Sequence, residues 1–316
     1  MNNGKNILIV AGGTGGHIFP GIVFGKKLRD EGNNVYWACG AREMEKTIYN
    51  SQDIEPLQLA IEGSPFGVKS FLERLTRLIT VLTSYIQTLT YIVKYKIDEI
   101  YLFGGYVSYA PLRAALRRKV PVTLHEQNAV AGKVTRIAAK KGVKIITGWP
   151  VCEGIKDFTY VGIPARESMR ISREEALKTL GLDLNVNAKI VGITGGSLAS
   201  ETLSNLLLKT ASLCKDSEFV FLSHERKDEG NIHFIPQSWN MNPFFSICDI
   251  LVCRSGGSTL AEALEWGMPT ITIPWPEAAD NHQESNAREF VKLAKNSYTF
   301  DENESPEKLA EIIKSF

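Results

Sequence analysis

Several features that would point to other classes of protein are absent from this 316-residue chain. No apolar run approaches the roughly 20 residues of a membrane-spanning helix. The five cysteines form no Cys-x-x-Cys pair, so we expect free thiols in a reducing cytoplasm rather than a disulfide framework. No Gly-x-x-x-x-Gly-Lys-Ser/Thr segment occurs, which argues against a P-loop. The first apolar run, Ile7–Val10, follows a short polar start, so we expect no signal peptide.

Charge is divided unevenly along the chain, although the net charge is only +1. Residues 1–160 carry 21 Lys and Arg against 13 Asp and Glu, a balance of +8. Residues 161–316 carry 15 against 22, a balance of −7. This asymmetry indicates that the N-terminal half faces something negative. Nucleic acid, a membrane surface and an acidic lipid head group all fit that charge, but nothing beyond charge suggests nucleic acid.

One local pattern recurs four times: an apolar, strand-like run ends at two glycines, and a helical stretch follows. Glycine permits a tight turn and a close approach to a ligand, and the next helix directs its free N–H groups and positive dipole end at the same point. Two copies in each half predict two doubly wound domains that close on a nucleotide or a diphosphate. The glycine turns are Gly12–Gly16, Gly104-Gly105, Gly195–Ser197 and Gly256–Thr259.

Alternating strand and helix signals predict an α/β protein with two Rossmann-like parallel-sheet domains, residues 1–160 and 161–316. The first glycine turn leads to a helix near Pro20–Glu31, and a hinge is expected at Tyr160–Pro164. The last segment, Pro306–Phe316, reads as a capped helix. Ligands of open parallel sheets bind beyond the carboxyl ends of the strands, so we expect a central cleft between the domains.

Two polar groups follow strands in the first half. His17 lies just after the first glycine turn, where a helix N-terminus favours the neutral imidazole that a general base needs. A structural hydrogen-bonding role is the alternative for this lone histidine. The run His125–Asn128 has four consecutive hydrogen-bonding side chains, a pattern typical of a binding rim, with a solvated turn as the alternative.

Two further polar groups lie in the second half. Glu262 comes three residues after Thr259, a spacing that fits either a capping box or a carboxylate that accepts from ribose hydroxyls. The cluster Pro274–Gln283 predicts sugar-hydroxyl binding. It holds two acids and a histidine, so a metal site is its rival. However, no Asp-x-Asp pair lies nearby, and the spacing matches no zinc pattern.

The segment Phe71–Tyr95 carries apolar residues at helical spacing, in a stripe wider than one core contact needs. A buried core face is the usual explanation. The alternative is a helix that rests on an anionic bilayer, because basic residues flank the stripe. These are Arg74, Arg77, Lys94, Lys96, Arg113, Arg117, Arg118 and Lys119.

Five strings in the chain resemble the MurG family, the UDP-N-acetylglucosamine:N-acetylmuramyl-(pentapeptide) pyrophosphoryl-undecaprenol N-acetylglucosamine transferases of bacterial peptidoglycan synthesis. The strings are Gly12–Pro20, Gly104–Ser108, His125–Asn128, Arg254–Thr259 and Ala278–Gln283, in the family's order. The resemblance implies a GT-B fold, in which the first domain binds the acceptor and faces the membrane and the second binds UDP-GlcNAc. In such a fold the last helix can cross back from the second domain to the first. It implies inverting, metal-independent and cofactor-independent transfer of GlcNAc to the C4 hydroxyl of lipid-linked MurNAc-pentapeptide. A peripheral enzyme at the cytoplasmic face of the cell membrane, acting in cell-wall biogenesis, cell shape and division, would follow.

The resemblance also assigns residues. It makes His17 the catalytic base, and it implies that Thr14, Gly15, Gly16 and Asn128 contact the GlcNAc moiety and the acceptor region. It implies that Arg166 and Ser197 contact the nucleotide base or the diphosphate, and that Gly257, Ser258 and Thr259 contact the UDP. It further implies that Glu262 contacts the ribose and that Gln283 contacts the donor sugar. Ala199 departs from the family, which usually has glycine there.

Two other readings stay open at this point. One is another UDP-sugar enzyme of the same architecture, either a glycolipid glycosyltransferase or a non-hydrolysing epimerase. The other is a nucleotide-sugar-binding or membrane-scaffolding protein without turnover.

Overall fold

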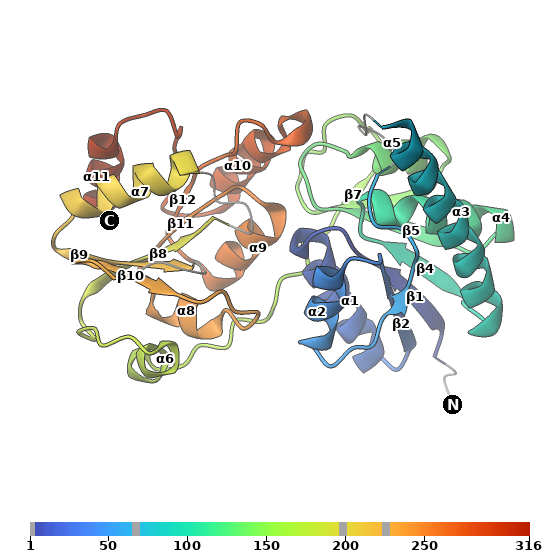
Figure 1. Cartoon of the computed structure of the whole chain (residues 1–316), viewed down its shortest axis with the longest axis horizontal. Helices are drawn as coiled ribbons and strands as arrows, with labels where there is room; N and C mark the ends of the chain where they lie inside the picture. The colour runs from blue at the N-terminus through green and yellow to red at the C-terminus, as the bar shows by residue number, and fades with distance from the viewer. Residues whose placement is uncertain (1–3, 65–69, 196–200, 223–227) are drawn as a thin grey trace. The chain divides into compact units, whose positions relative to one another are not determined.

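The computed structural model describes residues 4–64, 70–195, 201–222 and 228–316. The chain forms two compact units, Met1–Arg166 and Glu167–Phe316, each built on its own parallel sheet (Figure 1). The first unit extends a few residues past Tyr160, because the segment after its last strand, β7 Thr159–Tyr160, still packs on it. There the Gly162 carbonyl accepts a hydrogen bond from His125, at 2.8 Å.

The first unit has a seven-stranded sheet in the order β3-β2-β1-β4-β5-β6-β7. The strand order reverses between β1 and β4, which pair directly, and in such sheets the crevice for a ligand opens at this point. Both glycine turns of the unit follow these two strands. The strands are β1 Asn6–Val10, β2 Asn34–Cys39, β3 Leu57–Gln58, β4 Glu99–Leu102, β5 Val122–Glu126, β6 Lys144–Thr147 and β7 Thr159–Tyr160.

Helices cover both faces of this sheet. Side chains alternate along β1, so that Ile7 and Ile9 pack under α1 and α2, and Leu8 and Val10 pack under α3, α4 and α5. A strand buried on both faces reads as a continuous apolar run, as β1 does. The helices are α1 Gly15–Asp30, α2 Glu43–Asn50, α3 Phe71–Lys94, the short η1 Tyr106–Ser108, α4 Tyr109–Arg118 and α5 Lys133–Lys140.

The second unit has a six-stranded sheet in the order β10-β9-β8-β11-β12-β13. Its order reverses between β8 and β11, and these two strands lead into the third and fourth glycine turns. The strands are β8 Lys189–Thr194, β9 Ser217–Leu222, β10 Ile232–Ile235, β11 Ile250–Cys253, β12 Thr270–Thr272 and β13 Ser297–Thr299. The helices are α6 Arg173–Leu180, α7 Glu201–Leu213, α8 Asn242–Ile247, α9 Gly257–Trp266, η3 Ala279–Asn281, α10 His282–Leu293 and α11 Pro306–Ser315.

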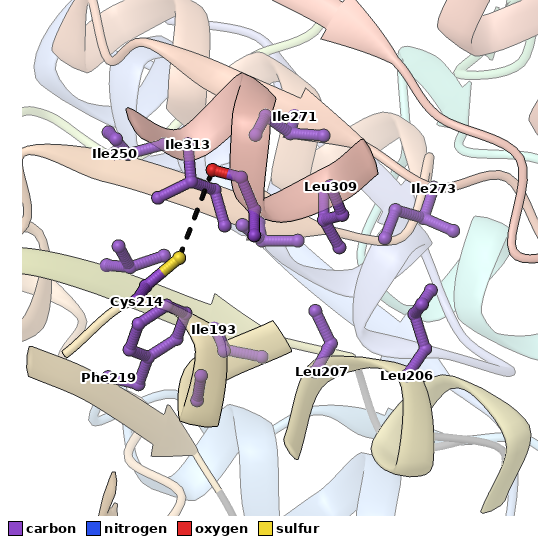
Figure 2. Packing of buried hydrophobic residues seen from close by; sticks show 14 of the residues in the cluster. Ile193, Leu206, Leu207, Cys214, Phe219, Ile250, Ile271, Ile273, Leu309 and Ile313 are labelled. Atoms are coloured by element: carbon purple, nitrogen blue, oxygen red, sulfur yellow. Dashed lines mark hydrogen bonds between the residues drawn. The ribbon is translucent and has the colours of Figure 1, made fainter. Parts of the chain in front are cut away.

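The last helix belongs to the core of this second unit. Leu309 and Ile313 of α11 pack with Leu207 of α7 over the β8–β11 face of the sheet, as Figure 2 shows. The Cys214 thiol adds a contact to the Ala310 carbonyl, at 3.9 Å. All five cysteines are free, so the expectation of free thiols is confirmed.

Candidate functional site

The first glycine turn leads directly into α1. The helix begins at Gly15, earlier than the expected start near Pro20, because Thr14 is already the extended N-cap residue. The Thr14 carbonyl accepts from the backbone N–H groups of His17 and Ile18, both at 3.1 Å. The N–H groups of Gly15 and Gly16 precede these first intrahelical bonds and are available to an anion at this edge of the sheet.

The buried carboxylate of Glu45 lies against the first glycine turn. Glu45 accepts from the Gly40 N–H at 2.7 Å and from the Tyr106 hydroxyl at 3.2 Å, and burial raises its pKa. A Cβ at Gly12 would overlap this carboxylate, and Gly13 has a φ of +92°, so the turn requires glycine twice. Sequence reasoning missed Glu45, because an acid on an amphipathic helix carries no signal of burial.

The second glycine turn passes beside the His17 ring. Gly104 and Gly105 have φ values of +73° and +68°, which favour glycine. A Cβ at Gly105 would lie 3.3 Å from Cδ2 and 3.4 Å from Nε2 of His17. Both glycine turns of the first unit therefore meet at this histidine, and its Nε2 edge has room because residue 105 has no side chain.

Hydrogen bonds connect His17 to the end of β5. Its Nδ1 lies 2.7 Å from Oε1 of Gln127, and Nε2 of Gln127 lies 3.1 Å from Nδ1 of His125. His125 stacks on Phe103 with a centroid distance of 5.3 Å, and burial lowers the pKa of His125 to about 4. His125 is therefore neutral at neutral pH.

The expectation of a binding rim at His125–Asn128 is wrong for three of its four residues. His125, Glu126 and Gln127 are buried, and only Asn128 is partly exposed. Buried polar groups are stable when hydrogen-bonded, and the Glu126 carboxylate accepts from the Asn128 N–H at 3.1 Å and the Gly132 N–H at 3.0 Å. Glu126 thus shapes the loop that presents Asn128.

Arg166 lies in the first unit. Its guanidinium stands 4.3 Å from the ring centroid of Phe19 on α1, in a cation–π contact. This places Arg166 close to the helix that carries His17. Its contact with a nucleotide stays a prediction.

The fourth glycine turn starts α9. Gly256 is the N-cap, and Gly257, Ser258 and Thr259 form the first turn with their N–H groups available. The capping-box alternative for Glu262 is wrong, because a helix that begins at Gly257 places this residue beyond its first turn. Glu262 is 5% exposed. In the third turn, Ser197 and Ala199 lie outside the described residues, so the prediction for Ser197 remains one.

Gln283 joins the ends of two strands. Its Oε1 accepts from the Ser255 N–H after β11 at 3.2 Å and from the Trp275 N–H after β12 at 3.0 Å. Among the residues that the structure describes, nothing accepts from its Nε2. Its contact with the donor sugar stays a prediction. Asn286, one turn later on α10, donates to the Ser255 carbonyl at 3.0 Å. Sequence reasoning missed Asn286, since its spacing signals only a helix.

Arg254, which lies just before the fourth glycine turn, contacts the residues after β12. The buried guanidinium donates to the Ile273 and Pro274 carbonyls at 3.2 and 3.1 Å and pairs with Glu302 at 2.6 Å. It stabilises the loop after β12.

Metal binding has no support in the described ranges. No three His, Cys, Asp or Glu side chains in them gather as a set of metal ligands. In the cluster after β12, Nδ1 of His282 donates to the Ala279 carbonyl at 2.7 Å.

The outer side of α3 is exposed and apolar. Its fully buried residues are Ser84, Thr88 and Ile92, and Val81, Tyr85 and Leu89 pack partly buried against the core. The expected core explanation therefore holds for this part of the stripe and is wrong for the rest. We call the following residues, which are 46–79% exposed, the α3 surface: Phe71, Leu72, Leu75, Leu78, Ile79, Leu82 and Ile86. The neighbouring α4 packs along α3 (Figure 1). Its arginines Arg113, Arg117 and Arg118 are exposed. No helix of the described chain is both long and apolar enough to cross a membrane.

Comparison with known proteins agrees with this architecture. The glycosyltransferase family 28 N-terminal domain matches residues 7–147, and the C-terminal domain of the same family matches residues 190–316. Among solved structures, MurG of Acinetobacter baumannii superposes with a TM-score of 0.72 at 23% identity and covers 99% of this chain and 90% of its own. The glycosyltransferase SnogD of Streptomyces nogalater superposes with a TM-score of 0.70 at 15% identity, and the match covers 99% of this chain and 91% of SnogD. The expected GT-B fold is confirmed.

Curated relatives share one name. A protein of Dechloromonas aromatica (strain RCB) is 30% identical over 99% of this chain and 90% of its own length. A protein of Protochlamydia amoebophila (strain UWE25) is 30% identical over 98% of this chain and 86% of its own length. Both are called UDP-N-acetylglucosamine--N-acetylmuramyl-(pentapeptide) pyrophosphoryl-undecaprenol N-acetylglucosamine transferase. The chain belongs to this family of transferases, within glycosyltransferase family 28.

Proposed function

We propose that the protein transfers GlcNAc from UDP-GlcNAc to the C4 hydroxyl of undecaprenyl-pyrophosphoryl-MurNAc-pentapeptide, with inversion at the anomeric carbon. Membership of the family supports the substrates, since relatives that align along nearly the whole chain carry names with this donor and acceptor. The observation that carries the proposal is the position of His17, in the first turn of α1 and beside both glycine turns of the first unit.

The chemistry needs one base and a stabilised leaving group. His17 Nε2 takes the proton of the acceptor hydroxyl while its oxygen bonds to the anomeric carbon of GlcNAc. The bond from that carbon to the diphosphate breaks, and UDP leaves with the electron pair. Helix N-termini and glycine-turn N–H groups stabilise the charge that develops on the diphosphate, a role that Arg166 can share.

The proposed substrate contacts divide between the units. In the first unit, which we assign to the acceptor, Thr14, Gly15 and Gly16 directly precede His17 in the chain. Together with Asn128, they contact the acceptor region and the GlcNAc moiety. The second unit is assigned to UDP-GlcNAc. There Gly257, Ser258, Thr259 and Ser197 hold the diphosphate or base, Glu262 accepts from the ribose hydroxyls, and Gln283 donates its amide to the sugar.

We also assign the α3 surface to an anionic membrane, at the cytoplasmic face where the lipid-linked acceptor lies. An amphipathic helix binds at the interface through its apolar side, and flanking cations add attraction to acidic lipids. The exposed Leu, Ile and Phe side chains of α3 and the exposed arginines of α4 provide both parts. The enzyme is peripheral in this account.

Release of UDP tests the proposal. The intact protein is mixed with UDP-GlcNAc in EDTA, with and without a short-chain lipid-linked MurNAc-pentapeptide. We expect release that depends on the acceptor. Donor consumption without acceptor, or donor binding without turnover, would contradict the proposal and favour an epimerase or a sugar-nucleotide-binding protein.

A further inference from the structure

The hydrogen bonds around His125 define where its proton is. Its Nε2 lies 2.8 Å from the Gly162 carbonyl, which can only accept, so Nε2 carries the hydrogen. His125 is 1% exposed, and the low pKa that burial gives it keeps the ring neutral. Its Nδ1 therefore holds a lone pair, directed at the amide of Gln127.

The orientation of that amide follows from its neighbours. One end lies 3.1 Å from the Nδ1 lone pair of His125 and 3.0 Å from the His125 carbonyl, so two acceptors face it and it must be the NH₂ end. The other end is then the Oε1 atom, 2.7 Å from Nδ1 of His17. Because an amide oxygen only accepts, His17 must carry its hydrogen on Nδ1.

We propose that Gln127, oriented by His125, is a positioning residue that holds neutral His17 in the Nδ1–H tautomer and so leaves the lone pair on Nε2. An isolated neutral histidine side chain favours the opposite tautomer, with the hydrogen on Nε2. The protein thus imposes the less common form. This inference deepens the proposed function and rests on it for its catalytic meaning, because only an Nε2 lone pair at the open edge beside Gly105 can accept the acceptor's proton.

The surroundings make this arrangement rigid. Gln127 is 2% exposed, and its own carbonyl accepts from the Trp149 indole N–H at 2.9 Å. The Phe103 ring stacks on His125 with an interplanar angle of 13°. A glutamine in this position orients the His17 ring without placing a charge beside it.

The test is the tautomer itself, measured by ¹⁵N NMR of the histidine rings in the free protein at neutral pH, with His17→Ala to assign the signals. We expect His17 protonated on Nδ1 in the wild type. Gln127→Met removes both the oxygen and the NH₂ group at similar size, and should shift His17 toward the Nε2–H form. Gln127→Glu keeps an oxygen for Nδ1–H and, as the neutral acid, a donor for His125, so it should restore the wild-type tautomer.

Turnover gives the second readout. Gln127→Met should lower kcat about 10-fold or more, a part of what a general base contributes, while the Kd for UDP stays within about twofold. Gln52→Met is the matched control, since this glutamine also accepts a hydrogen bond, from Lys26, and donates one, to the Ser51 carbonyl, but has no hydrogen bond to His17. It should change neither the tautomer nor kcat.

The outcomes separate the inference from the proposed function. A wild-type His17 that carries its hydrogen on Nε2, or an Nδ1–H form that persists in Gln127→Met, overturns the inference. An Nδ1–H wild type that depends on Gln127 supports it, whether or not turnover is seen. If such a protein shows no acceptor-dependent turnover, the proposed function fails alone. The wild-type spectrum decides the first point even if a variant does not fold.

Discussion

The amide oxygen of Gln127 lies 2.7 Å from Nδ1 of His17, although 110 positions separate the two residues in the chain. The contact joins the loop after β5 to the first turn of α1, across the intervening strand β4. It brings the residue that follows β5 to the side chain that we assign as base. This relationship connects the fold of the first unit to its proposed chemistry.

Replacing His17 with alanine should abolish most transfer and leave the donor bound. A general base supplies about 10²- to 10⁴-fold in rate, so we expect kcat to fall within that range. UDP-GlcNAc affinity, measured by calorimetry, should remain close to wild type. His233→Ala is the control, because this histidine pairs with Glu218 and Asp228 far along the chain, in the second unit. Near wild-type transfer by His17→Ala would remove the base assignment.

Acid should weaken the protein partly through His125. Its pKa is lowered from 6.5 to about 4 in the folded state, so between these values the unfolded chain binds a proton that the folded chain does not. The contribution of neutral His125 to the free energy of unfolding is complete above about pH 6.5. It is lost as the pH falls toward 4, which lowers that free energy by about 3 kcal/mol. His125→Phe keeps a ring to stack on Phe103 but cannot titrate. The free energy of unfolding should therefore fall less steeply between pH 7 and 5 in this variant than in wild type, and equal slopes would contradict the prediction.

The α3 surface should bind anionic vesicles. Leu75→Glu combined with Leu82→Glu places two charges on the apolar side, so the fraction bound to phosphatidylglycerol vesicles should fall severalfold without a change in thermal stability. Binding by the wild type should also weaken as salt rises, because salt screens the attraction between arginines and lipid head groups. Leu213→Glu, an exposed leucine on α7 of the second unit, is the control. Wild-type binding that is absent or unaffected by salt would contradict the membrane assignment.

Gln283 should distinguish UDP-GlcNAc from UDP. Gln283→Glu keeps an oxygen for the Ser255 and Trp275 N–H groups but loses the amide donor. A lost hydrogen bond costs about 0.5–1.5 kcal/mol, so UDP-GlcNAc should bind roughly 2- to 10-fold more weakly while UDP binds as before. Gln58→Glu, on the exposed end of β3, should affect neither ligand. An equal loss for both ligands would place Gln283 away from the sugar.

Much of this fold is readable from the sequence. Four strands, β1, β4, β8 and β11, are apolar runs that lead into glycine turns, and these runs are visible in the sequence. The turn at Gly12 predicted where the site lies, because the need for glycine there arises from the local backbone. The start of α1 at Gly15 was less predictable, since glycines disfavour a helix interior and only the fixed Thr14 N-cap shows where the helix begins.

The buried polar contacts were not predictable from sequence. Glu126 and Gln127 look like surface residues, and their burial depends on partners such as Gly132 and His17 that only the folded sheet brings close. For the α3 surface the error is the opposite one, because apolar residues that look like a core face are exposed. Their spacing is that of a core helix, and only the exposure seen in the structure distinguishes the two cases. Tertiary contacts decided each of these cases.

The most direct test of the account is the structure of the product. The wild-type protein is incubated with UDP-GlcNAc and the lipid-linked MurNAc-pentapeptide in EDTA, and the product is characterised by mass and by NMR of the new glycosidic bond. The account predicts one added GlcNAc in a β linkage to C4 of MurNAc, with one UDP released for each. An α linkage, another position of attachment, or UDP release without a disaccharide would contradict it.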